Sequence, residues 1–144
     1  MGLARLIYVS VMTDECDTSA LQRILDVSHA RNAMRKITGM LCYDPTFFLQ
    51  CLEGPRDAVN ALFADIIRDR RHKRVTLLEY GSIEEREFGA WSMAFVHAST
   101  IDRHAFEKYT HGPRFNPFSL SSDEAHELLV EVAHQGSRQM ARQR

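Results

Sequence analysis

Apolar positions along the chain change their spacing several times, and each change predicts an element of secondary structure. Short runs rich in β-branched and aromatic residues alternate with stretches in which apolar residues recur every three or four positions. The first pattern is typical of strands and the second of amphipathic helices. Strands are predicted at residues 5–11, 37–43, 47–52, 75–80 and 91–96, and helices at about 19–35 and 55–68.

The order of these elements predicts the fold class. The order β-α-β-β-α-β-β over residues 3–97 suits an α+β fold, a ferredoxin-like mixed sheet with two helices on one face. After it come a short helix, a break rich in proline, and a last helix that Ser121 and Glu124 are expected to cap. We therefore expect a domain over residues 1–97 and a C-terminal helical extension over residues 98–144.

The last helix carries an apolar stripe, formed by Ala125, Leu128, Leu129 and Val132. Such a stripe has to be buried against another surface. The sequence leaves two alternatives for this surface: the protein's own sheet, or a second molecule.

Composition narrows the class of protein. The chain has 144 residues, of which 44% are hydrophobic, and this is enough for a packed core. The formal net charge of −1 argues against a dedicated DNA-binding protein. No apolar run approaches the roughly 20 residues that a membrane span needs, and the N-terminal apolar stretch favours a strand over a signal peptide.

Three cysteines, with no C-x-x-C pair among them, predict neither a disulfide framework nor a zinc site. We therefore expect a soluble, cytoplasmic protein that binds neither nucleic acid nor membranes.

Three polar residues occupy positions that face the predicted core. Alternate strand residues share a face, so Tyr8 and Gln50, on strands that are neighbours in a ferredoxin-like sheet, are expected to face the same helical layer. An unpaired buried amide costs about 1–3 kcal/mol, so a simple Tyr–Gln hydrogen bond in the core is one explanation. Asn32 follows Leu21, Leu25 and Ser28 on one helix face, where it is either a C-terminal helix residue or a pocket residue. Together the three side chains predict a pocket for a planar heterocycle.

A basic run from Arg68 to Arg74 has a formal charge of +4. It is either a solvated surface or a phosphate contact close to the end of the helix that carries Asn32. The sequence has no dinucleotide-binding glycine motif, no P-loop and no nucleophile elbow, and its histidines have no metal-ligand spacing. These absences favour a binding protein over an enzyme.

Six segments of the sequence resemble those of a known family. The matching segments are L-I-Y-V-S at 6–10, Asn32, I-T-G-M-L at 37–41, F-L-Q-C-L-E-G at 48–54, R-D-R-R-H at 68–72 and W-S-M at 91–93. In this order and at these spacings they resemble the BLUF family, the blue-light sensors that use FAD.

The resemblance implies a non-covalently bound FAD whose isoalloxazine lies between the two helices and against the sheet. By match, Tyr8 is the electron and proton donor to the excited flavin, Gln50 is the amide that rearranges, and Asn32 hydrogen-bonds the ring. Trp91 and Met93 are the photoactive positions on the fifth strand that relay the change at Gln50. The other cofactor-binding positions implied by the resemblance are Ile24, Arg31, Asp69, Arg71 and His72.

No cyclase or phosphodiesterase domain follows the matched region, so output is expected through a separate effector protein or a change of homo-oligomer. The sequence argues against two other functions of this fold. A ferredoxin-like RNA-binding module needs stacking aromatics and a basic sheet face, which the sequence does not show. An acylphosphatase-like enzyme needs a first loop that binds phosphate, but here that loop carries Asp14, Glu15 and Asp17.

Overall fold

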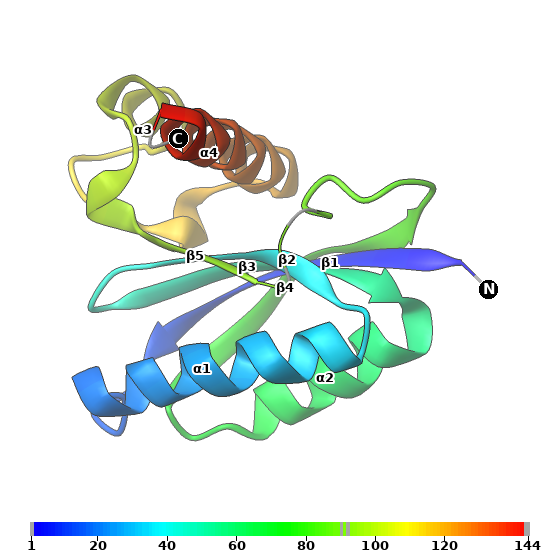
Figure 1. Ribbon diagram of the computed structural model, residues 1–144. Coiled ribbons are helices and arrows are strands. Elements are labelled where there is room, and N and C mark those ends of the chain that lie inside the picture. The colour runs from blue at the N-terminus through cyan, green and yellow to red at the C-terminus, as the bar shows by residue number, and fades with distance from the viewer. Residues whose placement is uncertain (1, 90, 92, 143–144) are drawn as a thin grey trace.

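The computed structural model describes residues 2–89, 91 and 93–142 of the chain. In this part of the chain a five-stranded sheet lies between two layers of helices (Figure 1). The strands are β1 (Leu3–Met12), β2 (Thr38–Tyr43), β3 (Phe47–Pro55), β4 (His72–Ile83) and β5 (Ala94–His97). The α-helices are α1 (Thr18–Met34), α2 (Arg56–Arg68), α3 (Arg103–Tyr109) and α4 (Ser122–Arg142), with short 3₁₀ turns at Ala98–Thr100 and Pro117–Ser119.

The strand order is β4-β1-β3-β2-β5. β1 lies between β4 and β3 and pairs antiparallel with both, while β2 pairs antiparallel with β3 and parallel with β5. The expected ferredoxin-like mixed sheet is confirmed. In the β1–β3 register Tyr8 lies directly opposite Gln50, as their expected common face requires.

The two faces of the sheet carry two separate apolar clusters. Leu6 and Tyr8 belong to the cluster under α1 and α2, whereas Ile7 and Val9 belong to the cluster under α3 and α4. This alternation follows from the two-residue period of a strand. Because both faces are buried, the central strands are apolar at successive positions instead of at every second one.

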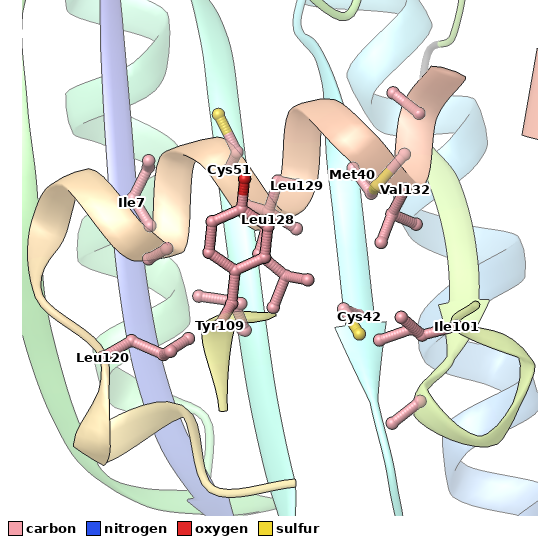
Figure 2. Packing of buried hydrophobic residues seen from close by; sticks show 14 of the residues in the cluster. Ile7, Met40, Cys42, Cys51, Ile101, Tyr109, Leu120, Leu128, Leu129 and Val132 are labelled. Atoms are coloured by element: carbon pink, nitrogen blue, oxygen red, sulfur yellow. The ribbon is translucent and has the colours of Figure 1, made fainter. Parts of the chain in front are cut away.

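The C-terminal extension covers its own sheet. Figure 2 shows Leu128 and Leu129 of α4 over the strands near Cys51, and Val132 next to Met40. The capping prediction for this helix is confirmed, because the Glu124 backbone N–H donates to Ser121 Oγ at 3.1 Å and the Ser121 N–H donates to Glu124 Oε1 at 2.9 Å. The apolar stripe is therefore satisfied within the chain.

Several boundaries differ from the prediction. β4 begins at His72, because the basic residues after it lie on an edge strand where their side chains stay in solvent. β5 begins at Ala94, so Met93 and Trp91 precede the strand instead of lying on it; Ser92 of the W-S-M match lies outside the described residues. Asp17 caps α1 by accepting from the Ala20 N–H at 2.7 Å. Among the described residues, no helix is long and apolar enough to cross a membrane.

Candidate cofactor site

A cavity of about 310 Å³ opens between α1, α2 and the sheet, a size in the range of small-molecule pockets. Of the residues expected to bind a cofactor, all line it: Tyr8, Ile24, Arg31, Asn32, Gln50, Asp69, Arg71 and His72. The wall also includes an apolar set contributed by both helices and the sheet, namely Val27, Leu41, Phe48, Leu62 and Ile66. Apolar side chains beside polar groups that can hydrogen-bond a ligand suit a planar heterocycle with polar edges.

The Gln50 amide is held at both of its ends. The Tyr8 hydroxyl donates to Gln50 Oε1 at 2.5 Å, and Gln50 Nε2 donates to the Met93 sulfur at 3.5 Å. All three side chains are buried. Burial raises the pKa of the Tyr8 phenol well above its usual value, and the nearby Asp69 carboxylate raises it further, so the phenol keeps its proton.

Asn32 shows that the cavity is suited to a polar ligand. Its side chain is only 1% exposed, yet neither its Oδ1 nor its Nδ2 has a hydrogen-bond partner. An unpaired buried amide is unfavourable, and buried polar groups in folded proteins are normally bonded. An isoalloxazine ring carries both carbonyl acceptors and an N–H donor, so the residues present fit FAD.

His72 forms the end of the cavity against the sheet. Its Nε2 bonds the Ile66 carbonyl oxygen at 2.5 Å and its Nδ1 bonds Ser10 Oγ at 2.8 Å. A carbonyl oxygen can only accept, so Nε2 carries the proton, and in the neutral ring Nδ1 accepts from the serine hydroxyl. Both nitrogens are thus used within the protein, and the ring offers a ligand only its face and its carbon edge.

A compact ion pair lies at the β4 end of the cavity. Arg71 donates to both carboxylate oxygens of Asp69, with its Nε 2.9 Å from Oδ1, and its backbone N–H also donates to Oδ1 at 2.9 Å. These hydrogen bonds lower the pKa of Asp69 and raise that of the guanidinium. Because Asp69 accepts hydrogen bonds from the Arg71 guanidinium, the orientation of the Arg71 side chain is fixed without a ligand.

One predicted photoactive residue lies apart from the others. Met93 belongs to the apolar cluster on the cavity side, whereas Trp91 packs against the cluster on the α4 side. The structure therefore brings Met93, and not Trp91, to Gln50.

Sequence reasoning also missed parts of the cavity wall, including Arg23 and Phe48. Arg23 is spaced eight residues before Arg31, on one helix face, and this spacing was the signal that could have found it. Asp65 lines the cavity as well, with Arg35 and Arg68 at 3.8 and 3.9 Å.

This α+β sheet, with a heterocycle-sized cavity on one face and a helical cover on the other, defines a small ligand-binding domain. The family model "BLUF: Sensors of blue-light using FAD" matches residues 3–94. The chain belongs to this family, and its cofactor is FAD.

Curated relatives agree with the family. The chain is 35% identical over 104 residues to the photoactivated adenylate cyclase subunit alpha of Euglena gracilis, a match that covers 71% of this chain and 10% of that protein. It is 30% identical over 91 residues to the blue light- and temperature-regulated antirepressor BluF of Escherichia coli, covering 63% of this chain and 23% of that protein. Since the chain spans only a small part of these relatives, the cyclase activity in the first name is not carried over to it.

Solved structures show the same architecture over nearly the whole chain. The ground state of BlsA aligns with a TM-score of 0.82 at 32% identity, covering 91% of this chain and 87% of that one. The dark state of BlrB, a BLUF protein, aligns with a TM-score of 0.78 at 28% identity, covering 93% and 97% of the two chains. The chain is therefore a blue-light sensor of the family that uses FAD.

Replacing Asn32 with alanine is expected to weaken FAD binding by about tenfold or more, because up to two hydrogen bonds to the ring are lost at about 1 kcal/mol each. The FAD-free protein is expected to be no less stable, because the asparagine amide has no partner there. A fluorescence titration with FAD and urea unfolding of the apoprotein measure the two effects. Asn60→Ala, at an exposed position of α2, is the matched control. An unchanged FAD affinity of the Asn32 variant would contradict the assignment.

Proposed function

We propose that Tyr8 and Gln50 form the light switch of this photoreceptor, with Tyr8 as the electron and proton donor and Gln50 as the amide that rearranges. When bound, FAD absorbs blue light and its excited ring becomes an electron acceptor. The observation that carries the proposal is the continuous buried chain of contacts from the Tyr8 hydroxyl through the Gln50 amide to the Met93 sulfur.

Because an amide has different groups at its two ends, the contacts from Tyr8 through Gln50 to Met93 have two possible arrangements. Gln50 now accepts from Tyr8 with its oxygen and donates toward Met93 with its nitrogen. Rotation or tautomerisation of the amide exchanges a hydrogen-bond donor for an acceptor at each of its ends. The Tyr8 hydroxyl and the Met93 sulfur then face a different hydrogen-bonding group, although no atom has been added or removed. A lasting change of hydrogen bonding without net reaction is a shift between two conformational populations.

The remaining cavity residues hold the cofactor. Asn32 bonds the ring, Ile24 packs against it, and Arg31, Asp69 and Arg71 contact the more polar part of the dinucleotide. His72 contributes packing through its ring, since both of its nitrogens are already bonded. The location of all these side chains around one cavity supports this assignment.

Residues 1–97 form the FAD-binding sensor in this proposal, and residues 98–144 form the helical extension that responds to it. The contact of α4 with the sheet face opposite the cavity supports such a role. Trp91 acts on that side, next to the extension, while Met93 acts next to Gln50. The three free cysteines, two of them buried, are compatible with a cytoplasmic location.

Output is proposed to pass to a separate effector protein, or to a change of homo-oligomer. The name of the Escherichia coli relative, an antirepressor, supports a protein partner. Self-association is supported by the edge strand β4, on which Leu77 is 49% and Tyr80 42% exposed. Light scattering of the dark and illuminated protein measures it, and Leu77→Lys is expected to lower the molar mass if β4 is the contact.

The absorption spectrum of the purified protein tests the function. A bound-flavin spectrum is expected, with a small red shift under blue light that reverses in darkness. Protein that is colourless and cannot be reconstituted with FAD would contradict the proposal, and salt-sensitive RNA binding by such protein would favour the RNA-binding alternative.

A further inference from the structure

A second buried polar cluster lies on the face of the sheet opposite the cavity. At its centre Glu53 of β3 is 0% exposed. Its Oε2 accepts from Arg5 Nε at 3.2 Å and from Arg5 Nη2 at 3.1 Å, and its Oε1 accepts from the Phe88 backbone N–H at 2.8 Å. The Glu87 backbone N–H lies 3.1 Å from both carboxylate oxygens.

These contacts fasten one segment to the sheet. Burying a carboxylate is unfavourable unless charge and hydrogen bonds compensate it, and here one cation and two backbone donors do so. Both donors belong to the segment that joins β4 to β5. Arg86, in the same segment, adds two more contacts: its side chain donates to the carbonyl oxygens of Glu53 at 2.9 Å and Lys36 at 2.7 Å.

The fastened segment leads directly to the light switch. The Phe88 carbonyl accepts from the Trp91 N–H at 3.2 Å, and the Trp91 carbonyl accepts from the Gly39 N–H of β2 at 3.3 Å. Met93 then follows, with its sulfur at the Gln50 amide. Gln50 and Glu53 are three residues apart on one strand, so their side chains leave opposite faces of the sheet. The segment therefore passes from Glu53 on one face to Gln50 on the other.

The same cluster reaches the C-terminal helix. Glu87 Oε1 accepts from Arg5 Nη2 at 3.0 Å and from His126 Nε2 of α4 at 2.9 Å. The side chain of Phe88 is fully buried among residues of α4 and the sheet. The described residues of this segment thus contact α4 through Glu87 and Phe88, and Gln50 through Met93.

We propose that Glu53 is a positioning residue of the light switch: its carboxylate holds the segment between β4 and β5 so that Met93 stays against the Gln50 amide. The proposal rests on the assigned role of Gln50. Gln50 Nε2 lies 3.5 Å from the Met93 sulfur, so turning the amide is expected to displace Met93. A loosely held segment is therefore expected to make the return to the dark orientation easier.

Glu53→Gln in the full-length, FAD-loaded protein tests the proposal, because it keeps the size of the side chain and removes its charge. Dark recovery after a blue-light pulse is expected to be at least threefold faster, and hydrogen exchange at the Glu87 and Phe88 amides is expected to be faster in the dark. Glu131→Gln is the matched control, since Glu131 bonds Lys108 and Tyr109 away from the segment, and its recovery is expected to equal that of the wild type. Wild-type recovery in Glu53→Gln with a normal red shift would overturn the proposal.

A double variant separates positioning from a general loss of stability. In a Met93→Ala background, Glu53→Gln is expected to have no further effect on recovery, because the side chain through which it acts is gone. Independent effects of the two changes on the recovery rate would overturn the proposal. A second variant is available if Glu53→Gln does not fold. Arg86→Gln loosens the same segment without altering the buried carboxylate, and it is expected to speed recovery. Wild-type recovery in Arg86→Gln would overturn the proposal. Absence of any red shift in the wild type would instead contradict the function proposed for Tyr8 and Gln50.

Discussion

Replacing Tyr8 with phenylalanine is expected to leave FAD bound and to reduce the light-induced red shift more than tenfold. The change removes only the hydroxyl, which is the donor to Gln50 Oε1. The ring itself keeps its packing against Phe63 and His72, at centroid distances of 5.7 and 6.2 Å, so the cavity wall is retained. Phenylalanine has no O–H proton to give and does not hold the amide in one orientation, so both functions assigned to Tyr8 are lost together.

Light-minus-dark absorption spectroscopy measures this effect, with FAD content determined on the same sample. Tyr109→Phe is the matched control, because Tyr109 is also buried and also donates its hydroxyl to a side chain, but to Glu131 in the C-terminal extension. The control is expected to give the normal shift. A normal photocycle in Tyr8→Phe would remove Tyr8 from the mechanism.

Gly39→Ala is expected to destabilise the fold by about 3 kcal/mol or more, and it has the largest expected effect on stability of the changes considered. A β-carbon at residue 39 would lie 2.0 Å from the Cys51 carbonyl oxygen and 3.0 Å from its carbonyl carbon. Both are backbone atoms of β3, so relief requires β2 and β3 to separate. These strands carry Leu41 and Gln50 of the cavity wall, and Gly39 also donates to Trp91, so loss of FAD binding is expected as well.

Urea unfolding of the two proteins, with FAD at the same concentration, measures the change. Gly81→Ala is the control within the same sheet, since a β-carbon there meets no atom within 4 Å. Its midpoint is expected to stay close to that of the wild type. Equal midpoints for Gly39→Ala and Gly81→Ala would show that β2 and β3 can move apart at little cost.

The central part of the site could be predicted from the sequence because it depends on strand periodicity. Tyr8 and Gln50 each lie at an alternate position of an apolar strand, and the expected pairing of those strands brought them together. Asn32 was found by its helical spacing, which left open whether it is a C-terminal helix residue or a pocket residue. Its unpaired buried amide in the structure favours the pocket residue. The capping box at Ser121 was readable because it depends on residues three positions apart.

Other features depend on contacts distant in the sequence, which a local pattern does not contain. Glu53 lies just beyond the strand predicted at residues 47–52, whereas in the structure it belongs to β3 and bonds Arg5 and the backbone of residues 87 and 88. The start of β5 was placed too early, because Trp91 and Met93 continue the apolar pattern of the strand without being part of it. The first helix was predicted to begin at about residue 19, whereas Asp17 caps it and the helix begins at Thr18.

The two layers of helices differ in when they become available during synthesis. Every residue of the cavity wall lies between Tyr8 and His72, whereas the helical cover of the other face is formed by residues beyond Ala98. A chain leaves the ribosome N-terminus first, and exposed apolar strands at that stage favour aggregation. We expect the nascent protein to assemble its flavin cavity while Ile7, Val9 and Leu49 still lack their cover. Limited proteolysis of ribosome-stalled chains of increasing length, with and without FAD, is expected to show protection of the cavity side before α4 has emerged.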